Sequence, residues 1–365
     1  IFDPHPYGVA GMDMSPDAQF IVTLSAPPPA SSPEAATWVQ EIAIWEWHAD
    51  SETPRYKASV NLPTGSTDSL TCVRFNPTDV RQLITHSTDR VVFWQWHTAA
   101  DGRAGSLTSF SPPVNSRDFG HSLGAFTDVT FLPPQKEFTA AANAVDESYD
   151  ASVGAVALSA VASTRDGDLL LWEAKLGGDS AMPQIASWRA TKLLNICRGS
   201  VMCLTVVAAG CPRPWLVAGG SDGAVRVYDY LFRVVSWFEK VDFSAITSLS
   251  FAMPTPAVRR AKIAEDAQSR GFKELDASFS CPAFVVGTSA AVIISLSASD
   301  ANKTPVAPAS TIGTVLAQGM ATAPTSIVGH PSEPYLAIGT QGGNVHLWNL
   351  DQRRLVNLRK LAREE

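Results

Sequence analysis

The feature that most constrains the fold is a repeated unit of two short strands, joined by a tight turn and closed by an aromatic residue. Its clearest copy runs from Leu216 to Asp229, where alternating apolar residues flank Asp222 and Gly223. An Asp-Gly pair supplies the positive φ angles that a two-residue hairpin needs, so this stretch predicts a hairpin. The unit closes on Tyr228-Asp229, which is typical of the second half of a WD-type propeller blade.

The closing aromatic residue recurs along the chain, which predicts one blade for each copy. Aromatic residues fill the slot in all copies but one, where Ser295 stands. They are Trp45, Trp94, Trp172, Tyr228 and Trp348. Because the position repeats, we expect these side chains to pack between neighbouring blades rather than to bind a ligand.

We therefore expect an all-β WD-repeat β-propeller over residues 1–365, with six blades visible in the chain. The predicted blades lie near residues 5–62, 63–115, 120–190, 196–243, 244–300 and 320–350. Ile1 and Phe2 resemble the end of a strand, so we expect the chain to be part of a longer protein with two propellers. Closing a ring removes exposed sheet edges, which favours seven blades, the seventh formed by residues before Ile1.

Turn residues and missing motifs argue against catalysis. Asp89, Asp166 and Asp222 occupy equivalent turns, and Gly223 follows the last of them. A carboxylate repeated at equivalent turns favours a structural role in capping the turn. The glycines before Asp222 are followed by a strand, whereas a phosphate-binding loop needs a helix. With no GxSxG motif and no metal-ligand spacing among the His and Cys residues, we predict no enzyme activity, cofactor or metal.

Composition excludes further classes of function. The chain has 28 Lys and Arg against 35 Asp and Glu, a net charge of −7, and no basic run. This disfavours nucleic acid and anionic membranes as partners, and also electrostatic attraction to acidic tubulin tails. No apolar run approaches the ~20 residues that span a bilayer. Five cysteines without a CxxC pair predict reduced thiols in the cytoplasm.

The fifth predicted blade is interrupted by a long charged segment, Pro254–Ser280. Loops longer than ~12–15 residues are uncommon unless they are functional or disordered. Two interpretations stay open, a solvated excursion and an arm that docks a partner. In the second, the candidate contacts are Arg259, Arg260, Lys262 and Phe272. Of the tryptophans outside the closing slot (Trp38, Trp188, Trp215 and Trp237), we expect one or two to be exposed partner anchors.

Several stretches resemble a family of cilia- and flagella-associated WD-repeat proteins that form a subunit of the calmodulin- and spoke-associated complex. The similarity covers most of the chain and matches the first propeller of that family. It is carried by Ile1–Asp3, Val39–Trp47, Phe75–Thr78, Tyr228–Leu231, Val234–Trp237, Ala245–Phe251, Val286–Ser289 and His330–Gly339. The Trp-x-Trp endings and the Phe-x-Pro-Thr-Asp element are more distantly similar to EMAP-like microtubule-associated proteins.

The resemblance implies a non-enzymatic scaffold of the ciliary axoneme, at the base of a radial spoke, that helps to regulate dynein-driven motility. Its implied partners are other proteins of the spoke base and of the same complex, with the doublet microtubule and calmodulin as further candidates. The implied location is the cytoplasmic cytoskeleton of the cilium or flagellum. The alternative function, from the EMAP-like similarity, is direct microtubule binding. In either case rigid blades would hold partners on their loops.

Overall fold

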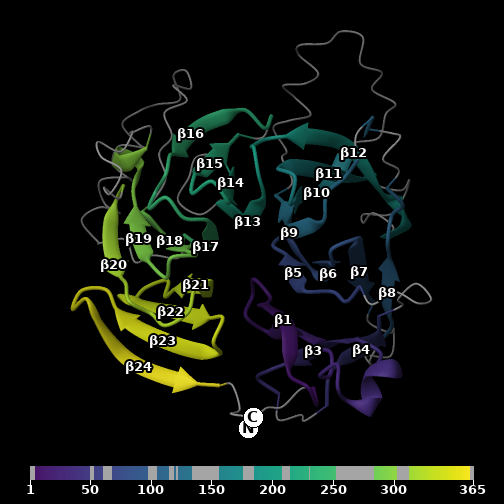
Figure 1. The fold of residues 1–365 in the computed structure, drawn as a ribbon. Helices are drawn as coiled ribbons and strands as arrows, with labels where there is room; N and C mark the ends of the chain where they lie inside the picture. Colours follow the sequence, from purple (N-terminus) through teal and green to yellow (C-terminus); the bar gives the residue numbers. More distant parts are fainter. Residues whose placement is uncertain are drawn as a thin grey trace. The chain divides into compact units, whose positions relative to one another are not determined.

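The computed structural model describes residues 5–49, 53–60, 68–97, 105–114, 119–120, 122–133, 156–175, 185–207, 214–229, 231–251, 283–301 and 312–361 (Figure 1). The chain forms two compact units, residues 1–196 and 197–365. The described part of each unit contains three four-stranded antiparallel sheets. In every sheet the four strands are consecutive in the sequence and pair in chain order.

The first unit contains the sheets β1–β4, β5–β8 and β9–β12. Their strands are β1 (Val9–Met14), β2 (Phe20–Ser25), β3 (Glu41–Glu46), β4 (Tyr56–Ser59), β5 (Cys72–Asn76), β6 (Asp79–His86), β7 (Val91–Trp96), β8 (Leu107–Phe110), β9 (Phe126–Leu132), β10 (Val156–Thr164), β11 (Asp168–Lys175) and β12 (Trp188–Asn195). The first strands of the sheets lie side by side, β1 against β5 and β5 against β9.

The second unit contains the sheets β13–β16, β17–β20 and β21–β24. Their strands are β13 (Val201–Val207), β14 (Trp215–Gly220), β15 (Val225–Tyr228), β16 (Val234–Phe238), β17 (Ile246–Ser250), β18 (Phe284–Thr288), β19 (Ile293–Leu296), β20 (Thr314–Ala317), β21 (Pro324–Gly329), β22 (Tyr335–Thr340), β23 (Asn344–Asn349) and β24 (Arg354–Lys360). Here too the first strands are neighbours, β13 against β17 and β17 against β21.

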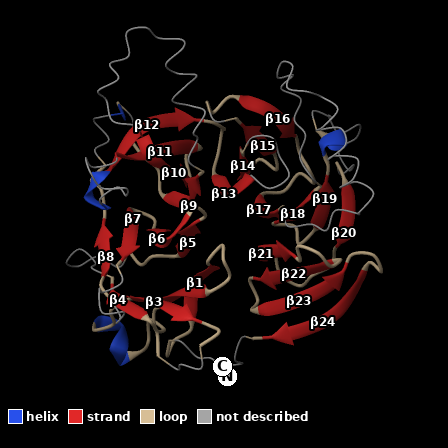
Figure 2. Cartoon of the chain, turned by 180° about the vertical axis from the view of Figure 1, so that it is seen from behind, coloured by secondary structure: helices blue, strands red, loops and turns tan. Residues whose placement is uncertain are grey.

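The predicted fold class is confirmed, because six four-stranded antiparallel sheets in chain order are the blades of a β-propeller. The described ranges contain short 3-10 turns at Pro33–Ala36, Ile185–Ser187 and Ala298–Asp300 (Figure 2). No helix in the described part of the chain is long and apolar enough to cross a membrane. The expected seventh blade concerns residues outside this chain.

Three sheets extend past the blade limits expected from the sequence. β12 ends at Asn195, β20 begins at Thr314, and β24 reaches Lys360. All three are outermost strands. β24 is exposed along its whole length, so it has no alternation of buried and exposed residues to mark it in the sequence.

Apolar side chains between neighbouring sheets form the cores of each unit. In the first unit one cluster joins the sheets β1–β4 and β5–β8, and a second joins β5–β8 and β9–β12. In the second cluster Phe93 stacks on Trp188 with ring centroids 4.1 Å apart. Trp96 stacks on Tyr56 at 5.6 Å in the first. The side chains that close each core therefore come from strands of two different sheets.

The hairpin around Asp222 differs from the expected two-residue turn. Gly220 and Ala224 form the last hydrogen-bonded pair, 2.9 Å between nitrogen and oxygen, so the loop has three residues. Only Gly223 has a positive φ, +75°, and Asp222 does not. A type I turn followed by a left-handed glycine gives this geometry and needs one positive φ instead of two. A Cβ at Gly223 would lie 2.9 Å from the Ser244 carbonyl oxygen, which also requires glycine there.

Two of the closing tryptophans are held by hydrogen bonds to buried threonines. Trp94 Nε1 donates to Thr85 Oγ1 at 2.9 Å, and Trp45 Nε1 donates to Thr23 Oγ1 at 3.0 Å. Thr23 Oγ1 also lies 2.9 Å from His5 Nε2. Each hydroxyl thus fixes the rotamer of an indole at the core.

We expect Thr85→Val to lower the free energy of unfolding by about 1–3 kcal/mol. Valine keeps the shape of threonine but leaves the buried Trp94 N–H without an acceptor. Denaturant unfolding of the two proteins measures the difference. Thr108→Val is the matched control, since Thr108 is exposed and bonds only a backbone carbonyl at 3.1 Å. Equal losses in both variants would contradict this explanation.

Candidate functional site

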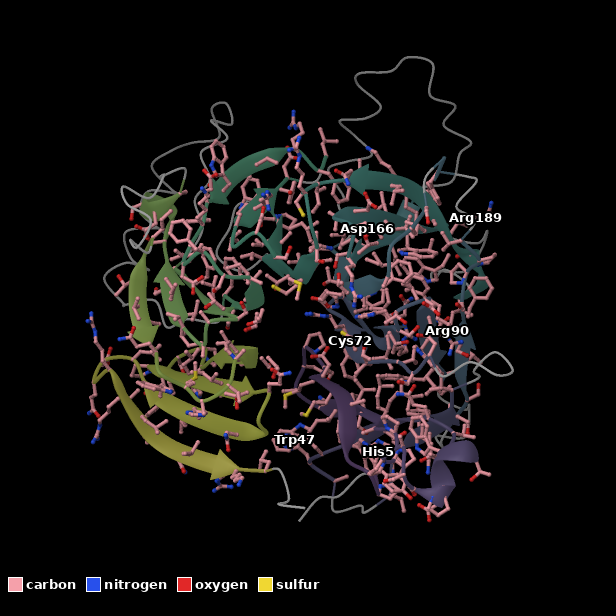
Figure 3. All side chains as sticks on the ribbon, viewed as in Figure 1. His5, Trp47, Cys72, Arg90, Asp166 and Arg189 are labelled. Atoms are coloured by element: carbon pink, nitrogen blue, oxygen red, sulfur yellow. The ribbon has the colours of Figure 1, made fainter. Side chains whose placement is uncertain are left out.

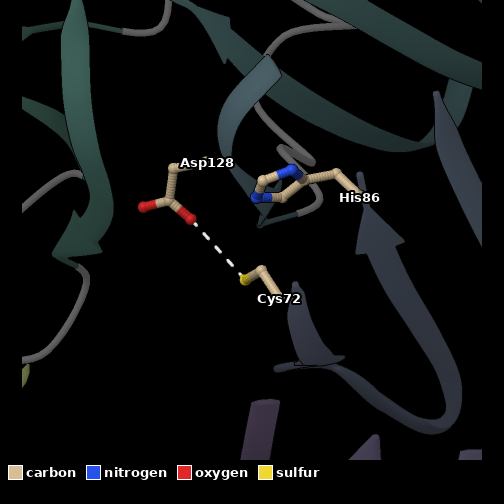
Figure 4. A group of neighbouring side chains, drawn as sticks. All are labelled: Cys72, His86 and Asp128. Atoms are coloured by element: carbon tan, nitrogen blue, oxygen red, sulfur yellow. Dashed lines mark hydrogen bonds between the residues drawn. The ribbon is translucent and has the colours of Figure 1, made fainter. Parts of the chain in front are cut away.

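Within the described residues, one cluster of side chains that could bind a metal ion lies where the second and third sheets of the first unit meet. Cys72 begins β5, His86 ends β6 directly opposite it, and Asp128 comes from β9 of the next sheet. Their ligand atoms all lie within 4.8 Å of one another (Figure 4). Figure 3 places Cys72 on the inner side of the first unit, whereas Arg189, on the outermost strand β12, lies at its periphery. We call these three side chains the Cys72 cluster.

Asp128 is an ion-pair partner as well as a member of the cluster. The Arg74 guanidinium donates to Asp128 Oδ1 at 3.0 Å and to Oδ2 at 2.9 Å. The Val129 N–H donates to Oδ1 at 2.8 Å, and the Cys72 thiol lies 3.8 Å from the same oxygen. The Asp128 side chain is 8% exposed and that of Arg74 is 35% exposed. This pair therefore ties β5 to β9 with a buried carboxylate.

His86 is held in one tautomer. Its Nδ1 lies 3.0 Å from the Ser87 carbonyl oxygen, which can only accept, so Nδ1 carries the proton. The lone pair is then on Nε2. Burial lowers the pKa of His86, with the Asp128 charge opposing the shift, so the imidazole is neutral at pH 7.

The surroundings of Cys72 favour the neutral thiol. Burial is the largest cause that raises the pKa of its thiol to about 12, against a lowering effect of Arg74. A thiol must ionise to attack, and catalytic cysteines have pKa values well below the ordinary one. Burial therefore works against ionisation of the Cys72 thiol at neutral pH.

The Cys72 cluster departs from the pattern of the second unit. At the equivalent register, directly after a bulge in the first strand, Cys203 faces Gly219, Ser248 faces Gly287 and Ser326 faces Gly339. A Cβ at Gly219 would lie 2.6 Å from the Ile246 side chain, so this slot is filled there by packing. At Cys72 the facing residue is His86, and a charged side chain from the next sheet completes the slot. The polar set is thus a local feature and not part of the repeat.

Asp13, on the inner strand β1, is a second carboxylate beside Arg74, and it is half-buried. Its Oδ2 accepts from the Phe75 N–H at 2.8 Å. Burial is the largest cause that raises its pKa above 3.8, opposed by the Phe75 N–H and by Arg74. A raised carboxyl pKa means that the folded state binds the proton more tightly than the unfolded state. Stability from this group is therefore full below pH 3.8 and is lost as the pH rises through the folded-state pKa.

We expect Asp13→Asn to raise the free energy of unfolding at pH 7, because asparagine keeps the acceptor for Phe75 and removes the desolvated charge. Below pH 3.8 the gain should shrink towards zero, since the wild-type carboxyl is then protonated in both states. Denaturant unfolding at both pH values tests this. A loss of stability at pH 7 would mean that attraction to Arg74 outweighs desolvation.

The predicted closing aromatics all lie on the third strands of their sheets. Trp45, Trp94, Trp172 and Tyr228 are buried on β3, β7, β11 and β15, and Trp348 is half-buried on β23. We propose that they pack between blades. Of the tryptophans outside this slot, Trp188 and Trp215 are buried, and Trp237 is 44% exposed on the outermost strand β16.

The predicted turn residues are found in turns with different contacts. Asp222 Oδ1 accepts from the Ala224 N–H at 3.1 Å, and Asp222 also pairs with Arg226. Asp89 and Asp166 are exposed. Their structural role remains a proposal. The candidate partner contacts Arg259, Arg260, Lys262 and Phe272 lie outside the described residues.

Sequence reasoning missed two carboxylates that lie just before a first strand and accept hydrogen bonds from the end of the second strand or the turn after it. Asp242, before β17, accepts from Thr288 Oγ1 at 2.5 Å and from Ser244 Oγ at 2.7 Å. Asp68, before β5, accepts from the Thr88 N–H and hydroxyl at 3.1 and 2.9 Å. An Asp just before a first strand, with a hydroxyl at the end of the second, is a signal that could have found them.

Four-stranded blades with a recurring aromatic on the third strand define a WD-type β-propeller protein. Over nearly its whole length the chain is similar to proteins named Cilia- and flagella-associated protein 251. It is 27% identical to that of Chlamydomonas reinhardtii over 99% of this chain and 40% of the relative. The Tetrahymena thermophila protein is 25% identical, over 98% of this chain and 32% of the relative. The Mus musculus protein is 21% identical, over 97% of this chain and 23% of the relative. The chain thus spans less than half the length of the curated relatives it matches.

Solved structures support the fold. The crystal structure of Sqt1 from Chaetomium thermophilum has a TM-score of 0.56 at 15% identity, over 98% of this chain and 73% of that one. The crystal structure of the same protein bound to the N-terminus of ribosomal protein L10 has a TM-score of 0.55 at 14% identity, over 98% of this chain and 76% of that one. No protein-family model matches the chain.

Proposed function

We propose that this chain is a non-enzymatic propeller scaffold of the ciliary axoneme. The observation that carries the proposal is the similarity over 97–99% of the chain to relatives from four organisms, all named as cilia- and flagella-associated. The proposed site is the base of a radial spoke, as a subunit of the calmodulin- and spoke-associated complex, where it helps to regulate dynein-driven motility. Other proteins of the spoke base are the proposed partners.

The proposed mechanism is rigid geometry. Blades tied by the Arg74–Asp128 pair and by stacked aromatic residues keep the surface loops in fixed positions. Proteins that bind one another through loops on such a framework are held at fixed spacing. The protonated Cys72 thiol and the absence of a nucleophile motif support a non-enzymatic role.

The test is to express the tagged full-length protein in a ciliated cell that lacks its own copy. We expect the protein to stay with detergent-extracted axonemes, to crosslink to radial-spoke-base proteins, and to restore beating. Retention with crosslinks to tubulin alone would favour the alternative, direct microtubule binding. Absence from axonemes would overturn both.

A further inference from the structure

We propose that Cys72, His86 and Asp128 bind a soft divalent cation of the zinc class. A thiolate, an imidazole and a carboxylate are the three ligand types that Zn²⁺ takes in proteins. The sequence gives no hint of such a site, because the thiol and the carboxylate are 56 positions apart and no compact motif links them. The pairing of β5 with β6, and the packing of β5 against β9, bring them together.

The spacing of the ligand atoms fits a tetrahedral ion. Zn–S bonds of about 2.3 Å and Zn–O bonds of about 2.0–2.2 Å at tetrahedral angles place the sulfur and oxygen roughly 3.5 Å apart. In the structure Cys72 Sγ and Asp128 Oδ1 are 3.8 Å apart. The imidazole lies beside both of these side chains (Figure 4), and all three ligand atoms lie within 4.8 Å. The sulfur–oxygen distance thus lies within a few tenths of an ångström of the tetrahedral value, and the imidazole would move towards the ion on binding.

Hydrogen bonds with neighbouring groups orient two of the proposed ligands, His86 and Asp128. Metal-binding histidines usually donate their other N–H to a carbonyl or carboxylate, which fixes the tautomer. The Nδ1–H of His86 does this to the Ser87 carbonyl and leaves Nε2 to bind the cation. Asp128 Oδ1 accepts from Arg74 at 3.0 Å and from the Val129 N–H at 2.8 Å, so the cation would replace the Arg74 bond at Oδ1 while Oδ2 keeps its 2.9 Å bond from Arg74. Arg74 then acts as a positioning residue for the carboxylate.

Binding exchanges one proton for one metal–sulfur bond. The Cys72 thiol releases its proton to the buffer, the thiolate bonds to the cation, and the neutral imidazole and the carboxylate contribute lone pairs. Nothing is oxidised or reduced. The cation would link the sheets β5–β8 and β9–β12 at their inner strands, next to the Arg74–Asp128 pair.

The experiment uses the 365-residue chain, purified free of metal and titrated with Co²⁺ as a spectroscopic probe for Zn²⁺. We expect about one Co²⁺ per chain at this site, a thiolate-to-cobalt charge-transfer absorption, and its loss on addition of Zn²⁺. Cys72→Ser should abolish the absorption and weaken binding by more than about 100-fold, because losing an outer contact alone costs 10–100-fold. The control Cys203→Ser, at the equivalent register of β13, should leave both unchanged.

A second variant distinguishes loss of a metal ligand from loss of the fold. His86→Gln keeps all the cysteines and should weaken Co²⁺ binding to a similar extent, with unchanged circular dichroism. Failure of the wild-type chain to develop a thiolate band would overturn the proposal. So would a band that survives Cys72→Ser, or binding that His86→Gln leaves intact.

Discussion

Phe93→Ala is expected to lower the free energy of unfolding by about 3–5 kcal/mol, the cost of emptying a well-packed aromatic site. Phe93 is 1% exposed on β7 and stacks on Trp188 at 4.1 Å. The edges of Phe131 and Trp172 complete its surroundings, with centroids 6.4 and 5.9 Å away. These neighbours come from the next sheet, so alanine leaves a cavity in the core that joins two blades.

Denaturant unfolding measures this loss, and Phe243→Ala is the matched control. Phe243 is 47% exposed, and the Lys240 ammonium lies 5.9 Å from the centroid of its ring. Its removal should cost less than about 1 kcal/mol, the value of an exposed cation–π contact. Similar losses for both variants would mean that the contact between the two blades contributes little to stability.

Residues on third strands were predictable because a repeat fixes their environment. Trp45, Trp94 and Trp172 fill one slot, and the alternation of apolar residues before them marks a half-buried strand. The burial of residues on outermost strands could not be predicted from the sequence. Trp188 and Trp237 both lie on such strands, yet the first is 4% exposed and the second 44%. Trp188 is buried because it packs against rings such as Phe93 of the neighbouring sheet, and local sequence does not encode that contact.

The Cys72 cluster was not predictable for the same reason. Strand register brings His86 opposite Cys72, which a hairpin assignment could have indicated. Asp128 joins them through packing between sheets, which depends on the relative twist and spacing of two blades. The same limit applies to Arg74, which in the sequence looks like an ordinary charged residue of an alternating strand.

Arg74→Met is expected to lower the free energy of unfolding at pH 7 by about 2–3 kcal/mol. Removing one partner of a buried ion pair costs ~3–5 kcal/mol because the other charge is left without compensation. The cost here is placed lower since the Arg74 side chain is 35% exposed and water already screens part of the attraction. Methionine keeps the apolar stem, so the loss reports the charge and its two hydrogen bonds.

A double-mutant cycle separates the pair from the rest of the site. In Arg74→Met with Asp128→Asn no unpaired charge remains, so the combined loss should be smaller than the sum of the single losses by at least about 1 kcal/mol. The Val129 N–H and the Cys72 thiol can still bond the asparagine oxygen, which keeps the local structure. The control pair is Arg55 and Glu46, whose side chains are 36% and 40% exposed and whose coupling should stay below about 1 kcal/mol. Strict additivity at Arg74 and Asp128 would show that this contact is no stronger than a surface ion pair, and that the inner strands β5 and β9 are held together by their apolar neighbours alone.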